Sequence, residues 1–534
     1  MELICRLAQF AVLFLFARVV NSQDNFTQPI VWQDLADIDL IRVNETFYYS
    51  ASNMHFSPSA PLLRSWDLVN WEFLTHSLPA LDQDYPKFDL EGASAYNQGV
   101  YASSIGYHSQ RGLYYWVGCL QGTGQTYIYA AREPQGPWEE ASVISDYCYY
   151  DDGLLIDDDG TMYVAYGKWV PNGADAKIWV ARLTDDLQHD VGEEVFQSNE
   201  EIQYIEGARF YKINGTYYIW LVNHHSEIGK GQIILKSSGG PFGPYDSWRR
   251  VLGSSGNPIP GASSPLQGGI VDTPNGDWWY IAFVDMWPAG RYPVLAPITW
   301  DDDGWPSVVF DGENNWGSSY PYPLAKHETK PLARKDDFTE LGPQYEWNHN
   351  PDNSKWSLDE GLKLQTATVT DDFFLARNTL THRILGPNST LTIELDYSSM
   401  ESGDMAGLAL FRYNADLISV TKQENGTSLQ MIHNITMDAT DGWHTINKGE
   451  AVASTPLNGS RAWLRAQAIN SGNQVTGTFS YSTDGVEFSP FGEMHNSLNG
   501  AVYFLGTRYG IFNYASKELG GSVTIKSLEI TQGE

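Results

Sequence analysis

Three carboxylic acids, Asp37, Asp151 and Glu206, lie far apart in the sequence but occupy matched positions of a recurring pattern. Each precedes a tight polar turn by seven or eight residues, and Ser103 and Gln267 hold the two remaining equivalent positions. Acids that share one site raise one another's pKa, which is useful in a general acid and wasteful in a scaffold. Glycoside hydrolysis needs one carboxyl group that protonates a leaving oxygen and another that activates water. A single acid would be read as a solvated strand end, but three matched acids favour one shared catalytic site.

The recurring pattern is an apolar strand, a tight polar turn and a second strand that opens with aromatic residues. The turns begin at residues 44, 111, 159, 214 and 275, so the copies lie 67, 48, 55 and 61 residues apart. Three of the turns are Asn-Gly or Asp-Gly pairs, the strongest short signal for a β-hairpin. No amphipathic helical periodicity of useful length separates the copies. One four-stranded sheet per copy predicts a five-bladed β-propeller, whose first strands line a central channel.

The length of 534 residues exceeds one ordinary core and predicts two domains. We assign residues 23–323 to the propeller and residues 324–336, which are polar and partly basic, to a linker. Residues 337–534 contain alternating strands, such as 391–395 and 523–525, without a helical pattern, which indicates a β-sandwich. The expected fold class is therefore all-β, a five-bladed β-propeller followed by a β-sandwich.

The N-terminus has the features of a signal peptide, which we place at residues 1–22. A basic start precedes an apolar run over residues 10–17, which is too short to span a bilayer. Seven Asn-x-Ser/Thr sequons follow, at Asn25, Asn44, Asn214, Asn388, Asn425, Asn434 and Asn458. Together these features predict a secreted, extracellular glycoprotein. A disulfide between Cys119 and Cys148 is possible in that compartment, but their spacing does not establish it.

The formal net charge of −32 restricts the partners of this chain. Nucleic-acid binding requires a basic face that neutralises phosphates, and the sequence has no Lys/Arg cluster of that kind. Anionic polymers and anionic membranes are disfavoured for the same reason, whereas a neutral polymer is permitted. The acidic run at 157–159 falls in a predicted hairpin turn, where solvated acids are a simpler interpretation than a metal site. Because no Cys/His cluster is present either, we expect neither a metal nor another cofactor.

Several segments, in order from about residue 28 to residue 310, resemble glycoside hydrolase family 43. They are residues 37–43, 65–71, 151–160, 206–209, 269–274 and 290–295. The region after the linker, with residues 347–351 and 376–380, resembles the concanavalin A-like C-terminal domain of the family's β-xylosidases.

This resemblance implies an inverting mechanism and a role for each acid. Asp37 would be the general base that activates water, and Glu206 the general acid. Asp151 would orient the acid and raise its pKa. Arg291 sits where the family uses an arginine near the sugar hydroxyls. Inversion requires the acid and the base to be about 6.5–9.5 Å apart, a spacing that opposing blades could provide.

Four further residues are candidate substrate contacts by the same resemblance. His55 and Phe56 follow the first aromatic strand, where family members form the sugar pocket, although a histidine packed inside a loop fits the sequence equally well. Tyr101 replaces a family tryptophan that often touches the substrate. Gln267 stands where many members carry a histidine near an axial water or calcium, and a central metal is therefore not expected.

The expected substrate is a neutral plant cell-wall polysaccharide of the arabinoxylan or xylan type. The resemblance implies removal of terminal α-L-arabinofuranosyl or β-D-xylosyl units, which are near-isosteric in this type of pocket. The loop at residues 54–61 and the C-terminal domain favour an arabinofuranosidase. The alternatives are a carbohydrate-binding propeller without catalysis and a retaining, fructan-cleaving propeller enzyme. The linkage, the role of the sandwich and the oligomeric state remain open.

Overall fold

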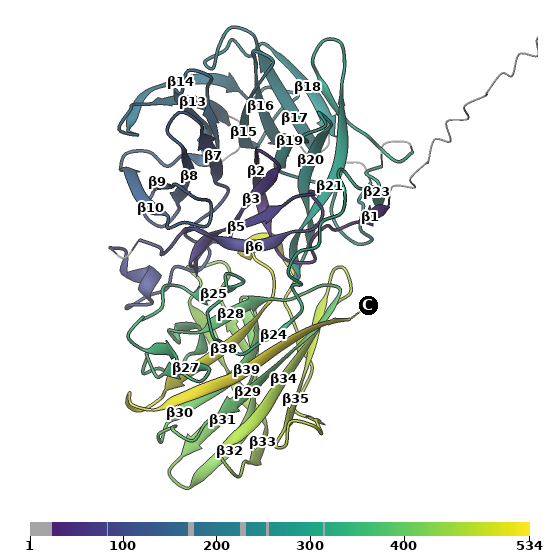
Figure 1. Cartoon of the computed structure of the whole chain (residues 1–534). Helices are drawn as coiled ribbons and strands as arrows, with labels where there is room; N and C mark the ends of the chain where they lie inside the picture. Colours follow the sequence, from purple (N-terminus) through teal and green to yellow (C-terminus); the bar gives the residue numbers. More distant parts are fainter. Residues whose placement is uncertain are drawn as a thin grey trace, which may run out of the picture.

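The computed structural model of this protein describes residues 24–82, 84–168, 176–224, 231–252, 256–312 and 315–533. The predicted signal peptide lies outside the described residues. Within them the chain forms strands β1–β39 and three short 3-10 helices, η1 (Pro86–Asp89), η2 (Phe373–Leu375) and η3 (Ala501–Tyr503). Figure 1 shows two bodies, a propeller and, below it in this view, a sandwich. The predicted all-β fold, a five-bladed propeller followed by a sandwich, is confirmed.

Each blade of the propeller is a four-stranded antiparallel sheet whose strands follow one another in the chain. Blades 1 and 2 comprise β2 (Ala36–Val43), β3 (Thr46–Ser52), β5 (Ser59–Ser65) and β6 (Glu72–Leu78), and β7 (Ser104–His108), β8 (Leu113–Leu120), β9 (Gln125–Ala131) and β10 (Glu139–Ile144). Blade 3 comprises β11 (Tyr150–Ile156), β12 (Met162–Lys168), β13 (Lys177–Leu183) and β14 (His189–Gln197). Blades 4 and 5 comprise β15 (Ile205–Ile213), β16 (Thr216–Asn223), β17 (Gly231–Ser237) and β18 (Ser247–Leu252), and β19 (Gly268–Asp272), β20 (Trp278–Met286), β21 (Gly290–Trp300) and β22 (Pro306–Val308).

The first strands of the five blades, β2, β7, β11, β15 and β19, form a closed ring, because each contacts the first strand of the next blade. Each is joined to its second strand by one of the predicted hairpin turns. In blade 4, Gly215 has a φ of +79°, a backbone conformation that favours glycine, which explains the Asn-Gly pair at this turn. Local turn chemistry therefore sets the register of the hairpins that surround the channel.

Two links tie separate parts of the propeller together. Strand β1 (Asn25–Thr27) pairs with β23 (Ser319–Pro321), which joins the two ends of the propeller segment. Cys119 in β8 forms a disulfide with Cys148, just before blade 3. The structure thus contains the pairing that the sequence left open.

The sandwich consists of two antiparallel sheets that enclose an apolar core. One sheet contains β26 (Trp356–Leu358), β27 (Leu362–Gln365), β39 (Ser522–Gly533), β29 (Asn388–Asp396), β34 (Arg461–Asn470), β35 (Val475–Ser482) and β36 (Ser489–Pro490), with β24 (Lys335–Asp336) on β39 and β37 (His495–Asn496) on β35. The other contains β33 (Thr445–Pro456), β32 (Gly426–Met437), β31 (Asn414–Gln423), β30 (Asp404–Phe411), β38 (Arg508–Ala515), β28 (Leu380–Arg383), β25 (Tyr345–Asn348) and β4 (Phe56–Ser57). Along β29 buried and half-buried residues alternate, as expected for a strand with one face on the core.

The propeller contributes a strand to the sandwich. Strand β4, in the loop after β3, pairs with β25 at the edge of the eight-stranded sheet. Beside it the buried Glu346 accepts a hydrogen bond from Arg508 (2.5 Å) and contacts Arg383 and His76, both at 3.0 Å. Burial alone would raise the pKa of Glu346, but the two guanidinium groups lower it well below its ordinary value. This buried ionic cluster and the shared sheet fix the orientation of the two domains.

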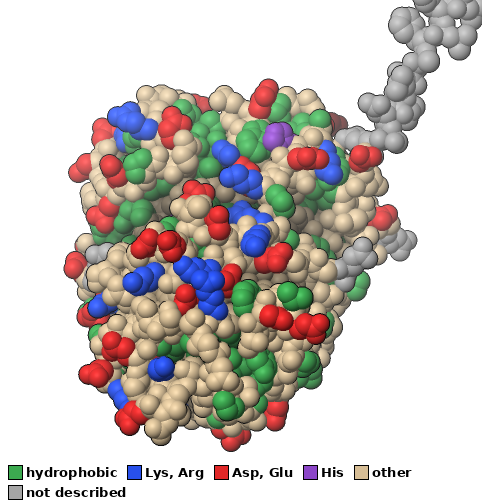
Figure 2. Space-filling model, turned by 60° about the horizontal axis from the view of Figure 1, so that its bottom comes forward, with side chains coloured by type: hydrophobic (Ala, Val, Ile, Leu, Met, Phe, Trp, Pro, Cys, Tyr) green, Lys and Arg blue, Asp and Glu red, His purple; other side chains and the backbone are tan. Residues whose placement is uncertain are grey.

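The surface carries the charge expected from the composition. Figure 2 shows acidic and basic side chains interspersed over one face of the molecule. In the part of the chain that the structure describes, no helix combines the length and the hydropathy needed to cross a membrane.

Candidate active site

The three predicted catalytic acids meet in one cavity of about 130 Å³. Asp37, Asp151 and Glu206 reach it from β2, β11 and β15, the first strands of blades 1, 3 and 4. Arg291, Tyr101 and Gln267 line the same cavity, so it brings together six of the eight residues proposed from the sequence. Its walls are otherwise mainly aromatic and apolar: Tyr150, Val222, Leu266, Phe283, Trp287, Ala501 and Phe504.

A shared irregularity of the inner strands directs the acids into the cavity. The pairing register shifts between Ala36 and Asp39 in β2, between Tyr150 and Gly153 in β11, and between Glu206 and Arg209 in β15. Asp37 and Asp151 have φ angles of 56° and 51°, and Gly207, which follows Glu206, has 73°. These bulges bend each strand at its start and turn the acid out of the sheet. Positive φ at two aspartates is a strained arrangement of the kind found at functional sites.

Asp37 is held at both of its carboxylate oxygens. Arg291 donates a hydrogen bond from Nη1 to Oδ1 at 2.7 Å, and the Ser52 hydroxyl donates to Oδ2 at 2.6 Å. All three groups are buried. The guanidinium and the hydroxyl fix the orientation of the carboxylate, which a general base requires.

Asp151 is buried, as Asp37 is, whereas the Glu206 side chain is about one-third exposed. Burial raises the pKa of Asp151 well above its ordinary value, and the negative charges of Glu206 and Asp37 raise this pKa further. Both causes disfavour the ionised form of Asp151. The charge of Asp151 also raises the pKa of the neighbouring Tyr150 phenol, which remains a hydrogen-bond donor at the cavity wall.

His224 contacts Glu206 and was not identified from the sequence. Its Nε2 atom lies 2.8 Å from Oε1 of Glu206, and both side chains are about one-third exposed. His224 follows Asn223, the last residue of β16, and lies two residues beyond Val222, the cross-strand partner of Glu206. Alternate residues of a strand share a face, so the pairing of Glu206 with Val222 places His224 on the same face as Glu206. The hairpin register could therefore have indicated this contact. The bulge in β15, which the sequence pattern did not reveal, displaces that register by one residue.

Arg209 ties the inner strands together beneath the acids. Its fully buried guanidinium donates hydrogen bonds to four backbone carbonyl oxygens. They belong to Ile38 (3.0 Å), Asp37 (2.6 Å), Ser103 (2.8 Å) and Asp152 (2.5 Å), in blades 1, 2 and 3. Of these four residues, Asp37 is itself a catalytic candidate and Asp152 follows the candidate Asp151. Arg209 therefore fixes the backbone that carries Asp37 and Asp151, a role that its place in the recurring pattern did not indicate.

The sandwich closes one side of the cavity with Ala501 and Phe504. Both residues belong to the loop formed by residues 498–505. Arg291 Nη2 donates to the Phe504 carbonyl at 3.0 Å, which joins this loop to the residue that holds Asp37. Buried Arg412 donates to three carbonyl oxygens of the loop, those of Leu498 (2.8 Å), Gly500 (2.5 Å) and Leu505 (2.7 Å).

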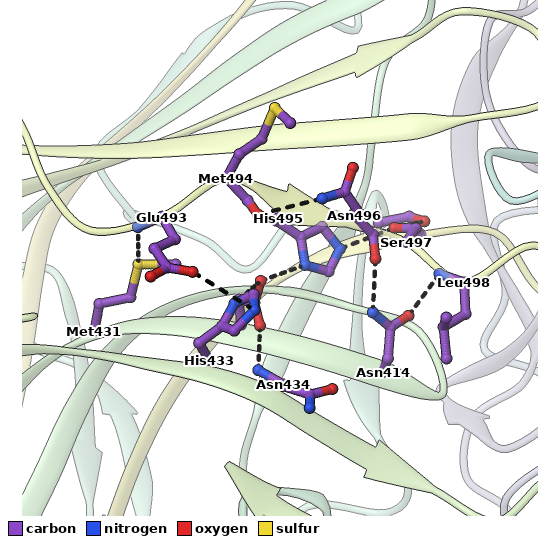
Figure 3. A network of polar contacts seen from close by, with 12 residues as sticks. Asn414, Met431, His433, Asn434, Glu493, Met494, His495, Asn496, Ser497 and Leu498 are labelled. Carbon is purple, nitrogen blue, oxygen red and sulfur yellow. Dashed lines mark hydrogen bonds and ion pairs between the residues drawn. The ribbon is translucent and has the colours of Figure 1, made fainter. Parts of the chain in front are cut away.

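The start of this loop is anchored by a polar network of the sandwich. Figure 3 shows Asn414 between Asn496 and Leu498, with its amide nitrogen bonded to the Asn496 carbonyl and its amide oxygen to the Leu498 N–H. The sandwich thus supplies part of the active-site wall, which answers a question that the sequence left open.

The remaining predicted residues have different outcomes. Tyr101 lines the cavity, donates from its hydroxyl to the Asn97 carbonyl at 2.8 Å and packs 5.9 Å from the Phe504 ring. Gln267 also lines it, and its Nε2 has no hydrogen-bond partner among the described residues, which leaves a donor for a ligand. Among those residues no group of three or more His, Cys, Asp and Glu is arranged to hold a metal ion.

The prediction that His55 and Phe56 form part of the sugar pocket requires correction. Neither residue lines the cavity as the structure describes it. His55 is fully buried and packs between Phe56 and Tyr96, and its Nε2 lies 3.3 Å from the Tyr503 hydroxyl. Phe56 belongs to β4 and pairs with Asn348 of the sandwich. The docking of the two domains, which local sequence does not reveal, places both residues inside the interface.

A five-bladed propeller whose inner strands present three acids to one small cavity defines a glycoside hydrolase. Residues 26–306 match the model of glycosyl hydrolases family 43, and residues 335–531 match the β-xylosidase C-terminal concanavalin A-like domain. The chain belongs to glycoside hydrolase family 43.

Proteins of both expected activities are similar to this chain. A β-xylosidase of Formosa agariphila is 26% identical over 94% of this chain and 89% of its own length. A non-reducing end α-L-arabinofuranosidase of Bacteroides ovatus is 26% identical, covering 81% and 83%. Among solved structures, a family 43 enzyme with an engineered active site, described as having both endo-xylanase and exo-arabinofuranosidase activity, has a TM-score of 0.89. It is 39% identical and covers 96% of this chain and 100% of that chain.

Proposed function

We propose that this family 43 enzyme is a secreted, inverting exo-glycosidase that removes terminal α-L-arabinofuranosyl units from arabinoxylan, with β-D-xylosyl units as the alternative sugar. The observation that carries the proposal is the convergence of Asp37, Asp151 and Glu206 on a cavity of about 130 Å³. That volume is well below the range of about 300–1,000 Å³ found for drug-sized ligands, which fits one monosaccharide rather than a polymer chain. A pocket of this size supports attack on a terminal sugar.

In the proposed mechanism Glu206 donates its proton to the glycosidic oxygen as the bond to the anomeric carbon breaks. Asp37 accepts a proton from a water molecule, which attacks the anomeric carbon from the opposite face. The product sugar has the inverted configuration, and Glu206 and Asp37 then exchange the proton with solvent. In a retaining mechanism Asp37 would instead act as a nucleophile and form a covalent glycosyl-enzyme intermediate, and the anomer of the first product separates the two.

The neighbouring groups have separable roles in this proposal. Asp151, which lies beside Glu206 in the cavity, is assigned to orient it. Gln267 and Tyr150 offer hydrogen-bond donors to the sugar hydroxyls, and the rings of Tyr101 and Phe504 offer apolar faces. Such a combination of apolar walls and a few directed donors suits a sugar. The similarity to an enzyme with exo-arabinofuranosidase activity supports arabinose as the sugar released.

Secretion is supported by three independent features. The signal-peptide pattern precedes the propeller, and the disulfide between Cys119 and Cys148 suits an oxidising compartment. Six of the seven sequon asparagines are exposed and therefore accessible to glycosylation, and Asn388 is half-buried.

Incubation of the protein with defined arabinoxylan oligosaccharides and with xylobiose tests the proposal. We expect arabinose as the first product, and NMR during the first turnovers should show the inverted anomer. Release of xylose alone would reassign the sugar, and the retained anomer would exclude the mechanism. Glycan binding without release of a reducing sugar would identify a non-catalytic propeller.

A further inference from the structure

A second cavity of this protein lies apart from the active site. It measures about 450 Å³, opens to the surface and lies where β6 of the propeller faces β25 and β26 of the sandwich. Both domains line it, the propeller with Pro58, Thr75 and Pro79 and the sandwich with Trp347, Asn353 and Trp356. Its volume falls within the range of small-molecule binding sites, about 300–1,000 Å³.

The walls of this cavity are held in place by bonds between the domains. Ser57 pairs with Trp347 across β4 and β25. Asn350 accepts a hydrogen bond from the Leu81 N–H at 3.0 Å and donates to the Leu81 carbonyl at 3.2 Å. A cavity with fixed walls is preorganised, because a ligand need not order them on binding.

The lining of the cavity is selective for a neutral ligand. None of its sixteen residues is Lys, Arg, Asp or Glu, although these make up 18% of the chain. The two ionisable side chains already have partners, since His76 contacts Glu346 at 3.0 Å and the Tyr345 hydroxyl donates to Asp336 at 3.1 Å. An anionic ligand would find no cation to pair with, and a cation would find no carboxylate.

The aromatic wall is suited to stacking on a sugar ring. Trp356 is half-buried and packs against Trp347, with ring centroids 5.3 Å apart. Its Nε1 donates to Asn353 Oδ1 at 3.0 Å, so its polar edge is satisfied and its apolar face is what a ligand meets. Four prolines, at positions 58, 79, 343 and 351, add apolar surface, and Thr75 and Asn353 offer polar groups to hydroxyls.

We propose that this cavity is a second, non-catalytic binding site for a neutral oligosaccharide, a backbone segment of xylan. In its choice of polymer the inference rests on the proposed function. Binding of the backbone at a separate site would raise the effective concentration of chain ends at the active site. The second site would therefore promote the hydrolysis of polymers and long oligosaccharides, which extend beyond the catalytic cavity.

Affinity electrophoresis through gels that contain soluble arabinoxylan tests this site in the full-length Glu206→Gln protein, which needs no turnover. We expect retardation of the parent protein and its loss in Trp356→Ala and in Thr75→Arg, which fills the cavity from the opposite wall. Trp248→Ala removes a half-buried tryptophan of β18 outside this cavity and should leave retardation unchanged. Unfolding midpoints of all variants check that the fold survives.

Enzyme kinetics supply the second readout. In the active background Trp356→Ala should raise KM on soluble arabinoxylan about threefold to tenfold. Unaltered retardation of both Trp356→Ala and Thr75→Arg would overturn the proposal, as would retardation by a β-glucan gel but not by arabinoxylan. If retardation depends on Trp356 but the protein without the Glu206→Gln change releases no sugar, the second binding site is supported and the proposed activity is rejected.

Discussion

His224 Nε2 lies 2.8 Å from Oε1 of Glu206, at the partly open mouth of a cavity in which Asp37 and Asp151 are buried. A carboxyl group that must hand its proton to a leaving oxygen needs a fixed orientation. Arg291 and Ser52 fix Asp37 in this way, and His224 is the corresponding partner of Glu206. Each of the two carboxyl groups assigned to proton transfer is thus positioned by a specific side chain.

Replacement of His224 tests this relationship. His224→Ala removes the contact and should lower kcat on arabinoxylan oligosaccharides about 10- to 100-fold, whereas His224→Gln, which retains a donor, should lose less. The loss should be smaller on aryl glycosides with good leaving groups, because these need little protonation. Steady-state kinetics on both substrates over a range of pH check the expectation. An unchanged pH profile with a rise in KM alone would assign His224 to substrate binding instead.

Glu206→Gln addresses the acid itself. The amide keeps the shape of the side chain but has no proton to donate, so activity on the natural substrate should fall about 100- to 10,000-fold. Activity on an aryl glycoside with a good leaving group should fall much less. Asp37→Asn serves as the matched control, because activation of water is needed whatever the leaving group. An equal loss on both substrates in Glu206→Gln would contradict its assignment as the acid.

The convergence of the acids was predictable because it depends on local signals. Short turns set the hairpins, and a propeller repeats these hairpins around an axis, so equivalent positions of the inner strands must meet. Asp37, Asp151 and Glu206 could therefore be placed together from their distances to the turns. Tyr101 and Arg291 followed from the family resemblance.

The parts of the site that depend on domain docking could not be predicted in this way. Phe504 reaches the cavity from the sandwich, and its loop contains Tyr503, which contacts His55 across 448 positions of sequence. No local pattern reports such a contact. His55 and Phe56 were misplaced for the same reason, since their loop donates β4 to the other domain. The strand bulges were also hidden, because they interrupt a register that the turns alone suggest.

Asp151→Asn should separate stability from activity. The folded-state pKa of Asp151 is raised, first by burial and then by Glu206 and Asp37. Such an acid binds its proton more tightly in the folded state, so its contribution to stability is greatest below the ordinary value of 3.8 and declines as the pH rises toward the raised pKa. The neutral amide lacks this decline, and asparagine tolerates the positive φ at this position.

We therefore expect Asp151→Asn to be more stable than the parent at pH 7 by about 1 kcal/mol or more, and closer to it at pH 4. Activity on oligosaccharides should fall, because the carboxyl group assigned to orient Glu206 is gone. Urea unfolding at the two pH values, together with kinetics, measures both effects. A variant that loses stability relative to the parent as the pH rises would contradict the assigned direction.

Arg209 offers the strongest test of how the fold positions the acids. Arg209→Met fills a similar volume but leaves four buried carbonyl oxygens, including those of Asp37 and Asp152, without their donor. Unsatisfied buried acceptors and the lost charge should lower the free energy of unfolding by about 3–5 kcal/mol. Arg64→Met is the matched control, because Arg64 pairs with Glu72 near the surface and its loss should cost about 1 kcal/mol or less. Chemical denaturation measures the free energy of unfolding of both variants. A similar loss of stability in both would show that the Arg209 guanidinium does not hold the inner strands together.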